Sequence, residues 1–161
     1  MNAPSLHPDV GALAGLLGTW RGQGAGEYPT IESFTYDEEV TFGHAGKPFL
    51  AYRQATVNRA TKLPAHAEGG YWRGVGGDRI ELVLAHPTGV VELATGTVEP
   101  TPTGLRIEFV STATVGTVTA KDVRALIRHF ELDGDVLRYR LEMAAVGQPL
   151  THHLAAELHR A

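Results

Sequence analysis

The chain has 161 residues, and its 14 Lys and Arg against 18 Asp and Glu give a formal net charge of −4. This length suits one domain with its own core, which we expect to span residues 1–161. The weakly acidic balance argues against nucleic acid or an anionic membrane surface as a partner. The absence of cysteine excludes disulfides, thiolate metal sites and a cysteine nucleophile.

The sequence shows no sign of a membrane span or a secretory leader. No apolar run approaches the roughly 20 residues that cross a bilayer. The first five residues lack the positive charge and apolar core of a signal peptide. We therefore expect a cytoplasmic protein.

The first predicted element is a short helix near the N-terminus. Pro8 is tolerated at the first helical position, and Gly18 is a typical helix end. Val10, Leu13 and Leu17 follow at the spacing of one helical face. No second helical stretch is predicted after Gly18.

The remaining chain shows strand periodicity. Apolar and polar residues alternate over 34–42, 79–84, 105–109 and 137–143, as in antiparallel strands with one buried face. Turn signals separate these runs, and Asp133-Gly134-Asp135 predicts a tight hairpin. The pattern predicts an all-β fold of about ten antiparallel strands. A closed up-and-down barrel preceded by the short helix would hide the sheet edges and leave room for a ligand.

A glycine-rich motif opens the first predicted strand. Gly18, Trp20, Gly22 and Gly24 share one face of the strand. Glycines on one face allow a close approach to the backbone or a sharp bend. We interpret the motif as a barrel corner closed by a tryptophan, because it lacks the lysine and the following helix of a phosphate-binding loop.

Histidines are the candidate functional residues. His86 continues an inward-facing apolar parity, and His66 begins another strand, which is a weak indication of a pocket. In the C-terminal strand, the alternation of apolar residues would place His152 inside the barrel. The opposite face of the strand carries His153 beside small residues, which would leave room for a ligand. Periodicity alone leaves both alternatives open.

Several segments together resemble the nitrobindins, a family of small all-β haem proteins. The matching segments are Gly18-x-Trp20-x-Gly22-x-Gly24, residues 26–30, 44–50, 66–71 and 84–89, and the C-terminal segment 147–154. The similarity covers nearly the whole chain.

The resemblance implies a ten-stranded barrel that holds one ferric haem b per subunit. The family's axial ligand, the histidine before a leucine, corresponds to His153, so that Leu150, Leu154 and Leu158 would pack outward. Thr30 and Lys121 correspond to haem contacts. The family's pocket-lining positions correspond to His66, His86 and Met143.

The resemblance also implies a function. Nitrobindins bind nitric oxide and isomerise peroxynitrite to nitrate, and we assign no catalytic residue beyond the haem iron. The expected partners are haem, nitric oxide and peroxynitrite, in a monomer or a homodimer.

Two other classes of function stay open. A barrel with an interior could be a noncatalytic carrier of a small apolar ligand, as lipocalins and fatty-acid-binding proteins are. It could also be an interaction module without a cavity. A fold alone cannot choose among these classes.

Overall fold

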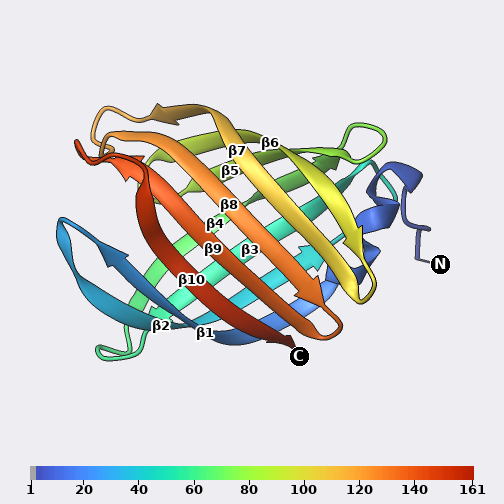
Figure 1. Ribbon diagram of the computed structural model, residues 1–161, viewed down its shortest axis with the longest axis horizontal. Helices are drawn as coiled ribbons and strands as arrows, with labels where there is room; N and C mark the ends of the chain where they lie inside the picture. The colour runs from blue at the N-terminus through green and yellow to red at the C-terminus, as the bar shows by residue number, and fades with distance from the viewer. Residues whose placement is uncertain (1–2) are drawn as a thin grey trace.

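The computed structural model describes residues 3–161 and shows a closed antiparallel barrel (Figure 1). Met1 and Asn2, which belong to the segment where no leader is expected, lie outside the described residues. The elements in chain order are η1 (Pro8–Leu16), β1 (Gly18–Tyr28), β2 (Ile31–Gly43), β3 (Phe49–Asn58), β4 (Pro64–Gly74), β5 (Arg79–His86), β6 (Val90–Thr101), β7 (Gly104–Gly116), β8 (Val123–Asp133), β9 (Val136–Ala145) and β10 (Thr151–Arg160).

The strand order confirms the predicted up-and-down barrel. Each strand pairs with its neighbours in the chain, and β1 pairs with β10 to close the sheet. Closure leaves no edge strand among the ten. The predicted hairpin also forms, since β8 ends at Asp133, β9 begins at Val136, and Gly134 takes a left-handed φ of 57°.

The N-terminal helix is a 3₁₀ helix that closes one end of the barrel (Figure 1). Its buried side chains are Val10, Leu13 and Leu16. The expected face contained Leu17 in place of Leu16, and this was wrong because a 3₁₀ helix repeats every three residues. The helix lies directly on β4, where a Cβ on Gly74 would come within 2.1 Å of the Asp9 carbonyl oxygen. Among the described residues, no helix is long and apolar enough to cross a membrane.

The barrel interior next to η1 is a dense aromatic core. Trp72 is fully buried, and its ring contacts Phe42, Phe109 and Phe130 at centroid distances of 4.9–5.0 Å. Trp20 closes the same end, with its Nε1 donating to the Leu16 carbonyl at 2.7 Å. This half of the barrel is filled by side chains.

The glycines of β1 make room for their neighbours in the barrel. A Cβ on Gly22 would lie 2.0 Å from the Glu157 carbonyl oxygen of β10. A Cβ on Gly24 would lie 2.3 Å from the Tyr36 ring of β2. The motif therefore lets β10 approach β1 closely and lets the Tyr36 ring pack on the backbone of β1.

A β-bulge in β10 changes which side chains face inward. His152 pairs with Glu142 and Leu154 pairs with Leu141, so His153 is the extra residue between them. His153 and Leu154 both line the interior, and Leu158 is fully buried in the core. The expectation that Leu154 and Leu158 pack outward was therefore wrong, because the bulge shifts the alternation by one residue. Leu150 lies before the strand and is exposed.

Candidate functional site

The half of the barrel away from η1 contains a cavity of about 520 Å³. Its walls are largely apolar side chains, among them Phe34, Val90, Leu126, Leu141 and Met143. The volume falls within the roughly 300–1,000 Å³ of small-molecule sites. The cavity makes this barrel able to enclose a ligand.

His153 lies in the cavity wall with one ring nitrogen held by the backbone. Its Nδ1 lies 2.9 Å from the Glu27 carbonyl oxygen, an acceptor, so Nδ1 carries the proton and donates. The Tyr28 ring packs edge-on against the imidazole at 5.2 Å. Burial lowers the pKa of His153, although the bond to Glu27 opposes the shift. The side chain is thus held as a neutral imidazole whose Nε2 lone pair is available to a metal.

The other predicted haem contacts occupy different places. Lys121 is exposed in the loop between β7 and β8 and lines the cavity. Thr30 is exposed in the turn between β1 and β2 and is not among the lining residues. Met143 lines the cavity from β9, and His152 points to solvent.

His66 and His86 meet inside the cavity. His66 Nε2 lies 3.2 Å from His86 Nδ1, and His86 Nε2 lies 3.2 Å from a carboxylate oxygen of Glu92. The β3–β4 ladder is irregular here, and the Thr56 hydroxyl bridges both the N–H and the carbonyl of His66. Local backbone irregularity thus fixes His66, as it does His153.

A buried ionic network supports these histidines. Arg128 donates to both carboxylate oxygens of Glu68 at 2.7 and 3.0 Å, and to both of Glu92 at 3.0 and 2.7 Å. Burial alone would raise the pKa of either carboxyl group. The Arg128 guanidinium and the hydrogen bonds from the neighbouring histidines together outweigh burial, so the pKa of Glu92 is lowered and that of Glu68 lies well below its usual range. Both carboxylates are therefore ionised, and Tyr52 also donates to Glu68 at 2.8 Å.

This network was not predicted from the sequence, although a signal was present. Arg128 occupies the same strand parity as the buried Leu126, Phe130 and Leu132, and Glu92 shares the parity of Val90 and Ala94. A charged residue at an inward position of a strand indicates a buried pair or a site.

A third buried carboxyl group, that of Glu38, is not among the residues that line the cavity. Glu38 accepts a hydrogen bond from the Tyr139 hydroxyl at 2.7 Å, and Tyr139 and Tyr36 share another at 2.8 Å. Burial raises the pKa of Glu38 to about 7, and the Tyr139 bond only partly opposes the shift. Unlike Glu68 and Glu92, Glu38 has no direct ion pair among the described residues.

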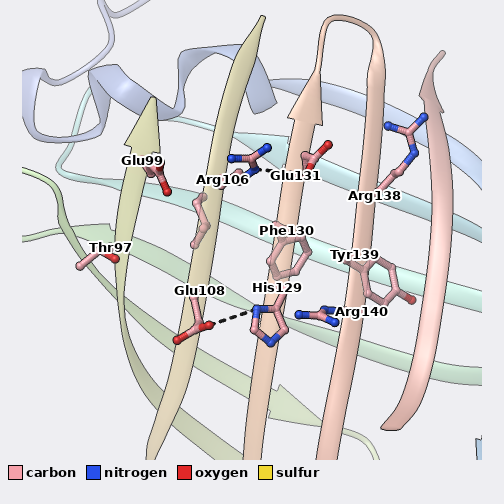
Figure 2. Close-up of a pocket in the computed structure, with 11 residues that line it drawn as sticks. Thr97, Glu99, Arg106, Glu108, His129, Phe130, Glu131, Arg138, Tyr139 and Arg140 are labelled. Atoms are coloured by element: carbon pink, nitrogen blue, oxygen red, sulfur yellow. Dashed lines mark hydrogen bonds and ion pairs between the residues drawn. The ribbon is translucent and has the colours of Figure 1, made fainter. Parts of the chain in front are cut away.

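A second hollow lies on the outer face of β6 to β9 and has a different character (Figure 2). Figure 2 shows Glu108 directed at His129 on the neighbouring strand. The Glu108 carboxylate lies 3.2 Å from His129 Nδ1. Arg106 and Glu131 form another exposed ion pair nearby. These solvated pairs are typical of an exposed barrel face and contribute little to stability.

The fold and the cavity together define a class of protein: a closed barrel with room for a ligand inside, where His153 presents an imidazole whose Nδ1 is held by the backbone. A planar macrocycle with a central metal fits the residues present. The cavity supplies apolar walls, His153 supplies an uncommitted Nε2, and Lys121 supplies a cation at the rim for an acidic group. Neutral imidazole is an ordinary axial ligand of haem iron.

Comparison with known proteins identifies the family. The family model described as "THAP4-like, heme-binding beta-barrel domain" matches residues 9–160, so the chain belongs to this haem-binding barrel family. This confirms the resemblance to nitrobindins seen in the sequence.

Individual relatives match over nearly their whole length. The chain is 56% identical to a peroxynitrite isomerase of Nocardia farcinica, covering 97% of this chain and 93% of that protein. It is 57% identical to peroxynitrite isomerase 2 of Mycobacterium ulcerans, covering 96% of each. The crystal structure of Rv2717c from M. tuberculosis superposes with a TM-score of 0.95 at 49% identity, covering 98% of this chain and 99% of that one.

Proposed function

We propose that this protein is a haem-dependent peroxynitrite isomerase that also binds nitric oxide. The observation that carries the proposal is His153, whose Nδ1 donates to the Glu27 carbonyl while Nε2 remains free in a roomy cavity. The names of relatives at 56–57% identity support the reaction. When bound, ferric haem b supplies a Lewis-acidic iron at which peroxynitrite rearranges to nitrate with no change in atoms or charge.

The chain's own residues hold and orient the haem. His153 would bind the haem iron through Nε2, and the Glu27 bond fixes its tautomer and ring orientation, as the outer partner of a metal-bound histidine usually does. Lys121 is the proposed partner of a haem propionate at the rim. We retain Thr30 as a proposed contact at the β1–β2 turn, which stands at the end of the barrel opposite η1 (Figure 1).

His66 and His86 are proposed to line the substrate side without binding the iron. Both nitrogens of His86 already have partners, and His66 Nε2 faces His86. We therefore expect neither histidine to bind the iron when haem is bound. A six-coordinate bis-histidine absorption spectrum would contradict this expectation.

The reaction needs no proton transfer from the chain, so no catalytic side chain is proposed. Replacing His66 or His86 by leucine in haem-loaded protein should lower nitrate formation less than about tenfold. A general acid typically contributes about 10²–10⁴-fold. A hundredfold loss in either variant would show that a catalytic residue had been missed.

The direct test is nitrate yield and peroxynitrite decay, measured by stopped-flow absorbance with haem-loaded and haem-free chain. Loaded protein should accelerate decay and return nitrate. Equal yields from haem-free protein would refute the enzyme and leave a carrier of an apolar ligand.

A further inference from the structure

The cavity contains a second set of metal-binding atoms, separate from His153. His66 Nε2, His86 Nδ1 and Glu68 Oε2 come from β4 and β5 and lie within 4.8 Å of one another. Two imidazoles and one carboxylate are a donor set found in zinc enzymes and other divalent transition-metal sites.

The three atoms are spaced as ligands of one ion. His66 Nε2 and His86 Nδ1 are 3.2 Å apart, and Glu68 Oε2 lies 3.5 Å from His86 Nδ1 and 3.6 Å from His66 Nε2. A point equidistant from the corners of this triangle lies about 2.0 Å from each corner. Zn²⁺ bonds to imidazole nitrogen at about 2.0–2.1 Å and to carboxylate oxygen at about 2.0–2.2 Å, so no ligand atom has to move far.

The groups behind the ligands are those that a metal site requires. His86 directs its second nitrogen, Nε2, at a Glu92 oxygen 3.2 Å away. With the ring proton on Nε2, Nδ1 can bind a metal in place of its present contact with His66 Nε2. This carboxylate–histidine arrangement fixes ring orientation and raises ligand basicity. Glu68 is held by Arg128 and Tyr52, and Thr56 holds the backbone of His66.

The local charge also favours a cation. Glu68, Glu92 and Arg128 are buried, with exposed fractions of 6%, 0% and 5%, and two carboxylates against one guanidinium leave one uncompensated negative charge. Uncompensated charge in a buried site is costly. A divalent ion bound to His66 and His86 would lie directly beside Glu68 and offset this charge.

We propose that His66, His86 and Glu68 form a binding site for a divalent transition-metal ion of the Zn²⁺ type, with a further coordination position open to the cavity. Glu92 is a positioning residue for His86 in this site. The inference does not rest on the proposed function, because none of the three ligand atoms belongs to His153.

The test uses the haem-free full-length chain, stripped of metals by dialysis against a chelator. Calorimetric titration with Zn²⁺ should show one ion per chain. Co²⁺ as a substitute should give the intense visible bands of a four- or five-coordinate ion, which hydrated Co²⁺ lacks. An absence of stoichiometric binding would overturn the proposal and reduce the cluster to a hydrogen-bonded network.

Variants locate the ion. His66→Ala and His86→Gln should each weaken Zn²⁺ binding by more than about 100-fold, and Glu92→Gln by about 10–100-fold, as expected for an outer partner. Circular dichroism and the urea midpoint verify that each variant is folded. Because Glu92→Gln touches no metal, an altered Co²⁺ spectrum in this variant would show that it reorients His86.

Two controls separate this site from its competitors. His129 on the outer face is directed at Glu108 (Figure 2), at 3.2 Å, and also lies 3.4 Å from Glu142. His129→Ala therefore removes a surface histidine–carboxylate cluster. It should leave Zn²⁺ affinity within about twofold. His153→Ala should also retain Zn²⁺ while losing haem. Loss of Zn²⁺ binding in either control, or its survival in His66→Ala and His86→Gln, would overturn the assignment.

Discussion

The same strands build two different halves of the barrel interior: one is packed with apolar side chains and the other contains a cavity. Next to η1, aromatic rings around Trp72 fill the space, and nearly every inward side chain is apolar. Toward the other end, the same strands present Glu68, Glu92 and Arg128 and then line a cavity. The comparison indicates that the filled half carries stability, while the open half places polar groups for binding.

The largest expected effect comes from the ionic network between the halves. Arg128→Met would leave two buried carboxylates without their cation, and we expect a loss of about 3–5 kcal/mol in unfolding free energy. Urea denaturation followed by tryptophan fluorescence measures it. Adding Glu68→Gln and Glu92→Gln should recover much of the loss. If Arg128→Met lowers the unfolding free energy by less than about 1 kcal/mol, the network between the two halves does not contribute to stability as inferred.

A matched pair of truncations tests the two halves directly. Phe109 is buried against Trp72 and Phe130, so Phe109→Ala should cost about 3–5 kcal/mol. Met143 faces the cavity and is only partly buried, so Met143→Ala should cost about 1 kcal/mol. Equal losses in denaturant titrations would mean that the cavity half is packed as tightly as the other.

Glu38 should make the stability of the protein depend on pH. Its pKa is about 7 in the folded protein against an ordinary 4.5, so the folded state binds more protons between these values. Stability is therefore lost as pH rises from about 4.5 through 7. Glu38→Gln should be more stable than the parent at pH 8 by up to about 3 kcal/mol, and the difference should shrink toward pH 4.5. Urea titrations at pH 8 and pH 4.5 measure this difference in stability. The same difference at both pH values would contradict the raised pKa.

The last prediction concerns the glycine face of β1. Gly22→Ala would place a Cβ against the backbone of β10, and we expect a loss of about 1–3 kcal/mol. Gly43→Ala in β2 is the control, because a Cβ there would meet no atom within 4 Å. Thermal unfolding of the two variants gives the comparison. A harmless Gly22→Ala would remove the close-contact explanation of the motif.

Much of the barrel could be predicted from the sequence. Alternating apolar residues and strong turn signals determine the ten antiparallel strands, because each strand buries one face. Pro8 and Gly18 likewise mark the helix ends to within a residue or two. The helix type was missed, since the spacing of Val10 and Leu13 suits both an α-helix and a 3₁₀ helix.

The site was harder to predict because it depends on departures from regular alternation. No period-two pattern reveals the bulge that lets His153 and Leu154 both face the cavity. The resemblance, and not the periodicity, pointed to His153. The meeting of His86 and Arg128 at Glu92 depends on the pairing of strands from different parts of the chain, although the inward parity of Arg128 was a readable signal.

The central claim is that His153, on the bulge of β10, holds haem, and absorption spectroscopy tests it most directly. His153→Ala and His152→Ala differ by one position on the same strand, and only His153 lines the cavity. After reconstitution with ferric haem and gel filtration, His152→Ala should keep a Soret band like the parent's, and His153→Ala should lose it. A Soret band retained by His153→Ala and lost by His152→Ala would contradict the account.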